Sequence, residues 1–351
     1  MAGAALNGPG DCEGGTLATP SLTASVLPRW QALLAGAIRS VDELWRVLDL
    51  PEAAKPGGQE GAALFPVLVP RGFAALMRRG DMSDPLLRQV LPVAAEGDDV
   101  PGFAVDPLHE DAAAVVPGLL HKYQGRALLV TTGACAVHCR YCFRRHFAYD
   151  DLPRGRRWWD AAVAAVAADP TLSEVLLSGG DPLTLPDGQL AALVADLAAI
   201  PHLTRLRVHS RLPVVLPERV DDSLLSWLTG SRLRPVLVIH ANHPQELSPA
   251  VLTACRRLRE AGVTVLNQAV LLAGINDHAD TLTALSESLF AAGVLPYYLH
   301  QLDRVAGAAH FSVADARAIA LVDEVAARLP GYLVPRLVRE EPGGRGKSPL
   351  R

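Results

Sequence analysis

The strongest constraint on the fold is a regular alternation of short apolar runs and longer helical segments that begins at Arg126. Six such strand–helix units fill residues 126–330. Consecutive units of this kind, joined by short connections, build a parallel sheet with right-handed crossovers. The expected strands are 127–132, 174–178, 205–209, 235–240, 264–268 and 296–301. The expected helices are 158–168, 190–199, 221–228, 249–261, 281–292 and 313–329.

Polar groups follow five of the six expected strands at the point where each strand ends. They are Ser178-Gly179-Gly180-Asp181, His209-Ser210-Arg211, His240-Ala241-Asn242-His243, Asn267-Gln268 and His300-Gln301-Leu302-Asp303. Each group alone can be an ordinary loop. A parallel barrel, however, places its site at the carboxyl ends of its strands, whereas a flat doubly wound sheet concentrates polar groups at the switch point. The pattern therefore favours a barrel, and the paired glycines would let the backbone approach a ligand closely.

The number of units predicts how far this barrel closes. Residues 126–330 give about 34 residues per unit, close to the ~31 implied by eight units in about 250 residues. Six units are two short of closure, so we expect an α/β fold with an open parallel (β/α)6, three-quarter TIM-like barrel over 121–330. A loose arm over 1–27 and a helical N-terminal region over 28–120 precede it. The segment 331–351 follows and contains an apolar run that suits a final strand.

Composition narrows the class of protein. Half of the 351 residues are hydrophobic and 20% are charged, which excludes a disordered or fibrous chain. A net charge of −4 gives no global attraction for nucleic acid or an anionic membrane. No run approaches the roughly 20 apolar residues that span a bilayer, and the N-terminus does not resemble a secretory signal. We therefore expect a cytoplasmic enzyme that binds neither nucleic acid nor membranes.

Three of the five cysteines lie together after the first expected strand, at Cys135, Cys139 and Cys142. Three thiolates on one loop can hold three irons of a [4Fe–4S] cluster and leave the fourth iron open for a ligand. Structural zinc is the alternative, and it would need His138 or His146 as a fourth ligand. A third interpretation, three inert buried cysteines, is poorly suited to such a crowded stretch.

Basic residues near these cysteines suit the binding of anions. Arg144 and Arg145 follow the third cysteine, and Lys122 and Arg126 lie at the entry to the first strand. Arginine can bind a carboxylate or phosphate in a bidentate manner, although a solvated basic patch explains any single one equally well. Lys347, in a Gly-rich segment near the C-terminus, is either a solvated tail residue or a Schiff-base lysine on a flexible loop.

Longer motifs add a family resemblance. With CAVHCRYCFRRHF and SGGDP the sequence resembles the radical S-adenosylmethionine enzymes. With HSRLPVVLPERV, NQAVLLAGIND, PYYLHQLDRVAGAAHF and PGGRGKSPL it resembles the lysine 2,3-aminomutase family, from about residue 70 to the C-terminus. Because the chain stops four residues after Lys347, it is most similar to the short branch that supplies (R)-β-lysine for modification of elongation factor P.

The resemblance implies three cofactors: a [4Fe–4S] cluster, S-adenosylmethionine and pyridoxal 5′-phosphate. The cluster ligands would be Cys135, Cys139 and Cys142. The contacts of S-adenosylmethionine would be Gly179, Gly180, Asp181, His240 and Gln268. Pyridoxal phosphate would form a Schiff base with Lys347, and its phosphate would meet Arg126 and Arg211. The substrate carboxylate would pair with Arg144, and its distal ammonium with Asp303 and Glu340.

The implied activity is an isomerase that moves the α-amino group of L-lysine from C2 to C3 by a 5′-deoxyadenosyl radical mechanism. Its expected partners are L-lysine and a reductant such as flavodoxin or ferredoxin, and a homo-oligomer is left open. The free-lysine enzymes usually carry Asp where Glu340 stands. One alternative is an aminomutase for another amino acid, although two carboxylates favour a cationic side chain over glutamate. Another alternative, from a different class, is a zinc-stabilised barrel that binds a small molecule without catalysis.

Overall fold

The computed structural model describes residues 27–52, 55, 65–155 and 157–351. At the centre of the fold is one ten-stranded sheet, in which the strands lie side by side in the order in which they occur along the chain. The strands are β1 (Ala114–Val116), β2 (Leu119–Tyr123), β3 (Arg126–Thr132), β4 (Glu174–Gly179), β5 (Arg205–Ser210), β6 (Arg234–Ile239), β7 (Thr264–Val270), β8 (Leu295–His300), β9 (Arg336–Arg339) and β10 (Ser348–Pro349). Strands β3 to β9 run parallel. The others pair antiparallel at the two edges. Among the described strands no pairing joins β1 to β10, so the expected open parallel architecture is confirmed.

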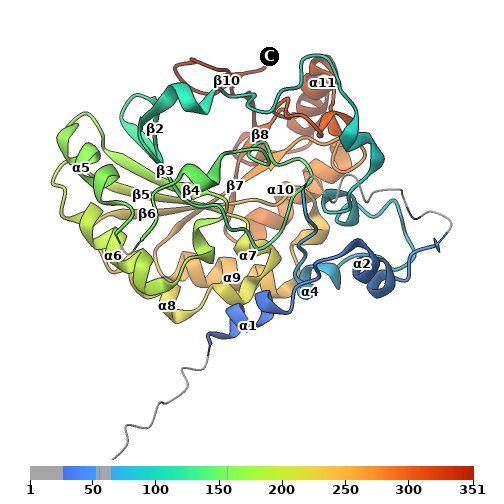
Figure 1. Cartoon of the computed structure of the whole chain (residues 1–351). Helices are drawn as coiled ribbons and strands as arrows, with labels where there is room; N and C mark the ends of the chain where they lie inside the picture. The colour runs from blue at the N-terminus through green and yellow to red at the C-terminus, as the bar shows by residue number, and fades with distance from the viewer. Residues whose placement is uncertain (1–26, 53–54, 56–64, 156) are drawn as a thin grey trace, which may run out of the picture.

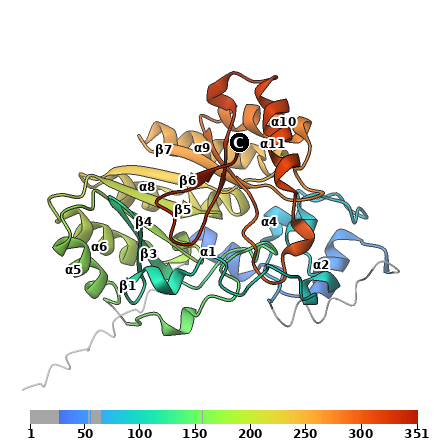
Figure 2. The same ribbon diagram turned by 90° about the horizontal axis from the view of Figure 1, so that it is seen from above.

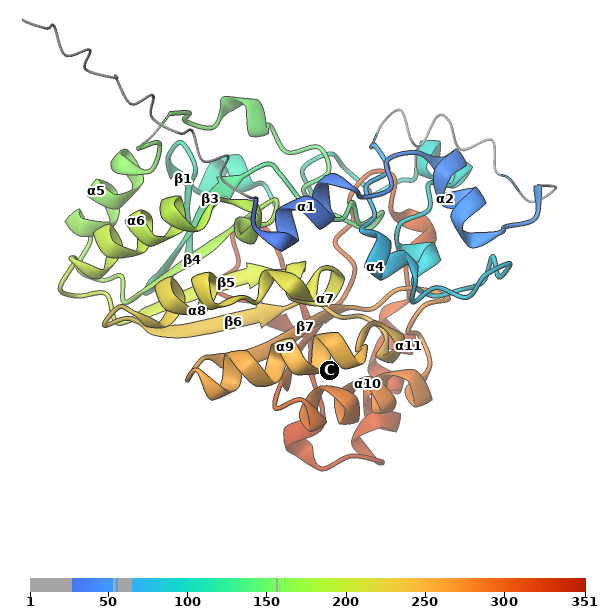
Figure 3. The ribbon, with the colours of Figure 1, turned by 90° about the horizontal axis from the view of Figure 1, so that it is seen from below.

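Helices follow the strands of the parallel part as expected. They are α5 (Asp160–Ala168), α6 (Asp187–Ala198), α7 (Leu212–Val215), α8 (Asp222–Thr229), α9 (Pro249–Glu260), α10 (Ala279–Ala291) and α11 (Asp315–Ala326). Figures 1 and 3 show α5, α6, α8, α9 and α10 arranged along the outer face of the curved sheet. Each of the six helices expected from the sequence is present, with ends that differ by a few residues, and α7 is an additional short helix after β5.

Local sequence explains where these helices begin and end, and α9 is the clearest example. The Ser248 side chain accepts a hydrogen bond from the backbone N–H of Val251, and Pro249 occupies the first turn, where its missing N–H costs nothing. Gly262 follows the helix with a φ of +86°, a left-handed conformation that favours glycine. The helix therefore ends at Glu260, and the chain enters β7 at Thr264.

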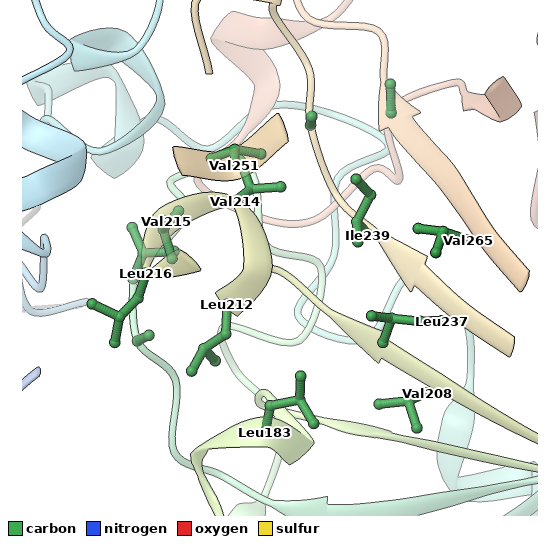
Figure 4. Packing of buried hydrophobic residues seen from close by; sticks show 14 of the residues in the cluster. Leu183, Val208, Leu212, Val214, Val215, Leu216, Leu237, Ile239, Val251 and Val265 are labelled. Carbon is green, nitrogen blue, oxygen red and sulfur yellow. The ribbon is translucent and has the colours of Figure 1, made fainter. Parts of the chain in front are cut away.

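Successive side chains of a strand point to opposite faces of the sheet, so one face packs in the core and the other faces the cavity. In β4, Val175 and Leu177 are buried in the core, whereas Leu176 and Ser178 face the inner cavity. The same alternation recurs in β5, where Leu206 and Val208 lie in the core and Arg207 and His209 line the cavity. Figure 4 shows core side chains of three neighbouring strands, Val208, Leu237 and Val265, opposite Leu212 of α7. The outer helices thus leave the inner face of the sheet free to carry a site.

The N-terminal region is helical only in part. It contains α1 (Arg29–Ala35), α2 (Val41–Leu48) and α4 (Arg71–Ala74), together with short 3₁₀ turns. The helical region expected over 28–120 is wrong at its end, because residues 114–116 form β1 and residues 119–123 form β2. Antiparallel pairing to β3 explains the difference, since the edge of the sheet offers unpaired backbone groups. Of the arm expected over 1–27, all but Leu27 lies outside the described residues.

The C-terminal segment returns to the sheet. Strand β9 forms where a final strand was expected and adds a seventh parallel strand, and β10 pairs beside it. Figure 2, seen from above, shows this red C-terminal chain crossing over the inner face of the sheet. In the part of the chain that the structure describes, no helix is long and apolar enough to cross a membrane.

Candidate active site

A cavity of about 480 Å³ lies on the inner face of the sheet. Its walls come from the loops after the parallel strands, from β2 and from the C-terminal segment. The structure brings to this one cavity every residue to which a site role was assigned from the sequence. These residues are Arg126, Cys135, Cys139, Cys142, Arg144, Gly179, Gly180, Asp181, Arg211, His240, Gln268, Asp303, Glu340 and Lys347. The individual role of each of these residues stays a prediction.

The paired glycines seat the cysteine loop. Gly179 has a φ of +124°, and a Cβ on Gly180 would lie only 2.4 Å from the carbonyl oxygen of Ala134. The backbone N–H of Gly180 donates to the carbonyl of Thr132 at 2.6 Å, and that of Asp181 donates to the carbonyl of Ala134 at 2.7 Å. Glycine is therefore required here because one backbone packs directly against another, in addition to any contact with a ligand.

Asp181 is already saturated with protein hydrogen bonds. Its carboxylate accepts from the Ser210 hydroxyl at 2.7 Å and from the backbone N–H groups of Arg211 at 2.7 Å and Leu212 at 3.2 Å. A fourth bond comes from the backbone of Leu183. Burial raises the pKa of Asp181 to about 6, and these hydrogen bonds oppose that effect. The carboxylate thus ties the turn after β4 to the turn after β5.

The three cysteines line the cavity, whereas His138 and His146, the two candidates for a fourth zinc ligand, are not among the residues that line it. His138 Nδ1 lies 2.7 Å from the carbonyl of Pro66, and His146 Nε2 lies 3.2 Å from the carbonyl of Ala306. In the described residues, no three His, Cys, Asp or Glu side chains converge on one ion. A cubane cluster places each thiolate on a different iron, so it does not need such convergence. The donor set therefore fits a cluster better than zinc.

Burial also affects the thiols themselves. It raises the pKa of Cys142 to about 11 and raises the pKa of Cys135 well above its usual value. Thiolates of this kind form when a metal supplies the compensating positive charge, so uptake of iron would release protons.

Arg211 lies beside the cysteine loop. Its Nη1 is 2.7 Å from Cys139 Sγ, and its Nη2 donates to Gln89 at 2.6 Å and to Glu246 at 3.1 Å. A cofactor phosphate at Arg211, as the family resemblance implies, would have to displace one of these partners. Gln89 comes from the N-terminal region, and no motif in the sequence pointed to it.

A continuous chain of ion pairs crosses the other side of the site. Arg144 binds Glu110 through two hydrogen bonds of 2.6 and 2.8 Å. Lys122 lies 2.9 Å from Glu110 and 3.1 Å from Glu340, and Lys347 lies 2.6 Å from the second oxygen of Glu340. Burial alone would raise the pKa of Glu340, but the two lysines outweigh it and hold that pKa below its usual range. Sequence reasoning missed Glu110, which stands in no recognisable motif.

Asp303 differs from these carboxylates because its side chain has no hydrogen-bond or ion-pair partner among the described residues. Burial raises its pKa to about 7, and the negative charge of Glu340 adds to the effect. An unpaired carboxylate in a cavity favours a cationic ligand, which would restore its ionised form.

Three histidines supply further unused groups. The Nε2 atoms of His209, His240 and His300 are buried and have no partner among the described residues. Burial lowers the pKa of His240 to about 3 and lowers the other two well below the usual value, so all three rings are neutral. Buried polar atoms are normally satisfied. These atoms therefore fit a polar ligand that fills the cavity.

Lysine is scarce in this chain, which makes its placement informative. The sequence has three lysines, Lys55, Lys122 and Lys347, although Lys and Arg together number 33. Two of the three line the cavity. Among side chains, the primary amine of lysine forms a Schiff base with a cofactor aldehyde, and arginine cannot replace lysine in that reaction. The cavity therefore fits pyridoxal phosphate as well as an iron–sulfur cluster.

Comparison with known proteins agrees with this chemistry. Residues 129–285 match the family model of the Radical SAM superfamily. The L-lysine 2,3-aminomutase of Escherichia coli K12 is 48% identical over 95% of this chain and 96% of its own length. That of Haemophilus influenzae is 44% identical over 91% of this chain and 94% of its own. That of Clostridium subterminale is 36% identical over 92% of this chain and 77% of its own.

The fit between Gly180 and Ala134 gives a first prediction. Gly180→Ala forces a Cβ against the cysteine loop, and we expect a loss of about 1–3 kcal/mol of unfolding free energy together with lower iron content after reconstitution. The control is Gly188→Ala in the first turn of α6, where nothing lies within 4 Å and alanine should stabilise by about 0.5–1 kcal/mol. Thermal unfolding and iron analysis measure both, and equal behaviour of the two variants would contradict the packing argument.

Proposed function

The chain belongs to the lysine 2,3-aminomutase family of radical S-adenosylmethionine enzymes, and from this premise we propose that it converts L-lysine to β-lysine. The reaction moves the α-amino group from C2 to C3, so the protein is an isomerase. The observation that carries the proposal is the identity of 48% over 95% of the chain to a curated L-lysine 2,3-aminomutase. The gathering of all the predicted site residues around one cavity supports it.

Family membership implies a [4Fe–4S] cluster, S-adenosylmethionine and pyridoxal phosphate. Cys135, Cys139 and Cys142 would hold the cluster, and Lys347 would anchor pyridoxal phosphate. When bound, these groups supply a radical that removes an unactivated hydrogen and a π-system that lets nitrogen migrate. The protein's part is to align the groups and to exclude water.

Lys347 is prepared for this role by its partner. The pKa of Glu340 is held below its usual range by the two lysines, and its carboxylate pairs with the Nζ of Lys347 at 2.6 Å. An ammonium cannot attack a carbonyl, so Lys347 must give up its proton before it binds the cofactor. Once Nζ is no longer an ammonium, the second oxygen of Glu340 becomes available to another cation, such as the distal end of the substrate.

The charge of the cavity supports a cationic substrate. Asp303 offers an unpaired carboxylate, and the released oxygen of Glu340 offers a second. A glutamate side chain would meet two negative charges here. Arg144 Nη1 donates to the Ser178 hydroxyl and to the Gly179 carbonyl. A substrate carboxylate would compete with these two acceptors for the same N–H groups. We therefore favour lysine over the alternative of another amino acid.

The wider setting of the reaction is also proposed. Identity is higher to the E. coli relative than to the Clostridium relative, at 48% against 36%. The branch that makes (R)-β-lysine for elongation factor P is what the family resemblance implies, and we propose it on that ground. The enzyme would act in the cytoplasm, would receive its electron from a flavodoxin or ferredoxin, and could assemble as a homo-oligomer.

The direct test is product analysis. Protein reconstituted anaerobically with iron and sulfide, then incubated with L-lysine, S-adenosylmethionine, pyridoxal phosphate and dithionite, should form β-lysine that chromatography separates from lysine at the same mass. Heat-denatured protein is the control. Turnover of a different amino acid in parallel incubations, with lysine unchanged, would select the alternative aminomutase.

The two cavity lysines can be distinguished chemically. Borohydride treatment of the protein with pyridoxal phosphate should attach the cofactor to Lys347, as peptide mass mapping will show. Lys347→Arg keeps the positive charge beside Glu340 but should abolish attachment. Lys122→Arg, the matched variant, should keep it. Attachment to Lys122 in the wild-type protein would refute the assignment of Lys347.

The pKa of Asp303 predicts a pH dependence with a definite sign. The ionised carboxylate binds an ammonium, and its fraction rises as pH passes the raised pKa of about 7. Lysine affinity should therefore improve about tenfold between about pH 6 and pH 8, beyond any change that is due to the substrate's own α-amine. In Asp303→Asn, titration of the substrate's α-amine still affects binding as it does in the wild-type protein. The variant should bind lysine more weakly, and its affinity should lack the additional pH dependence that comes from the carboxylate. Parallel pH profiles for the two proteins would remove Asp303 from the specificity site.

A further inference from the structure

The guanidinium of Arg211 makes a direct contact with a predicted cluster ligand. Its Nη1 lies 2.7 Å from Cys139 Sγ, and only 5% of the residue is exposed. Arginine stays protonated in proteins. The contact therefore places an N–H donor and a fixed positive charge on one sulfur of the cysteine loop.

Neighbouring side chains hold this guanidinium in place. Nη2 donates to Gln89 at 2.6 Å and to Glu246 at 3.1 Å, and both partners are fully buried. The guanidinium carbon also lies 5.6 Å from the ring centroids of both Phe73 and Tyr141. A charge fixed by charge-assisted hydrogen bonds and stacked rings has little freedom to turn away from the sulfur.

This arrangement requires the tertiary fold. Arg211 follows β5, Cys139 follows β3 and Glu246 follows β6, while Gln89 comes from the N-terminal region. Gln89 Nε2 donates to Glu246 at 3.0 Å, and Glu246 also accepts from the backbone N–H of Asn242 at 2.9 Å. The N-terminal region thus helps to set the electrostatics of the cysteine loop.

The physical consequence concerns the ease of reduction. The reduction potential of an iron–sulfur cluster depends on its net charge and on hydrogen bonds to its sulfurs. Reduction adds one negative charge, which a donor and a cation on Cys139 stabilise. Glu246, a buried anion on the far side of Arg211, weakens that stabilisation. The two residues should therefore act on the potential with opposite signs.

We propose that Arg211 is a positioning residue that raises the reduction potential of a cluster held by Cys135, Cys139 and Cys142, with Glu246 as its opposing counter-charge. No bond forms or breaks at Arg211, and the single electron comes from the external reductant. The inference rests on the cluster of the proposed function and is independent of lysine as the substrate. In this proposal the partner of Arg211 is Cys139, and not the cofactor phosphate that the family resemblance implies.

The test is a redox titration of the reconstituted full-length protein, followed by electron paramagnetic resonance without S-adenosylmethionine or pyridoxal phosphate. In Arg211→Gln, the ratio of reduced to oxidised cluster at a fixed potential should fall about tenfold, equivalent to about 59 mV for one electron. In Glu246→Gln the ratio should rise. Arg219→Gln is the matched control, because Arg219 is equally buried, pairs with Asp187 at 2.6 Å and stacks on Trp30 away from the cavity.

The control variant should lose stability and keep the wild-type potential. Unchanged potentials in Arg211→Gln, or shifts of the same sign in Arg211→Gln and Glu246→Gln, would overturn the proposal. If Arg211→Gln does not fold, the potential of Glu246→Gln alone tests the proposal, because the proposal requires that potential to be more positive than in the wild-type protein. A wild-type protein that takes up no cluster would overturn this inference and the proposed function together. If the reduction potentials shift as predicted but the protein forms no β-lysine, the proposed function is contradicted and the inference about Arg211 stands.

Discussion

The backbone contact between the cysteine loop and the turn after β4 is the constraint on which the site depends. Gly180 has no room for a side chain because the Ala134 carbonyl lies where its Cβ would be. The next residue, Asp181, uses its carboxylate to bind the hydroxyl of Ser210 and the backbone of Arg211. Gly180 and Asp181 therefore fix the turns after β3, β4 and β5 relative to one another. The position of Arg211 against Cys139 follows from the same constraint.

The distribution of charge in the cavity follows from the cost of burying ions. Buried charges persist only when they are paired, and the chain from Arg144 through Glu110, Lys122 and Glu340 to Lys347 satisfies that rule at every step. Asp303 alone lacks a partner among the described carboxylates of this cavity. A group that the protein leaves unsatisfied is the natural place for a ligand of opposite charge.

The sequence was sufficient for the features that are local or periodic. The six strand–helix units could be predicted because apolar periodicity determines them, and the cavity could be located because polar residues end the strands. Glu110 and Gln89 could not be found in this way, since the site arginines that they bind, Arg144 and Arg211, lie more than 30 residues away along the chain. The side-chain direction of Arg211 was equally inaccessible, because it depends on Glu246 and on the packing of the N-terminal region. Antiparallel pairing turned residues 114–123 into two strands, an effect of the sheet edge that no local pattern announces.

The scarcity of lysine links these observations. A chain that uses arginine almost everywhere retains two lysines in its cavity, and Glu340 bridges them. Arginine would satisfy a purely structural ion pair at least as well, because its planar fork matches a carboxylate. A compact amine that can lose its proton offers what arginine cannot, which is covalent chemistry with a carbonyl group. In the proposed function, the bridging carboxylate would have two states, one in which it neutralises Lys347 and one in which it binds an incoming ammonium. A single glutamate would then couple attachment of the cofactor to recognition of the substrate.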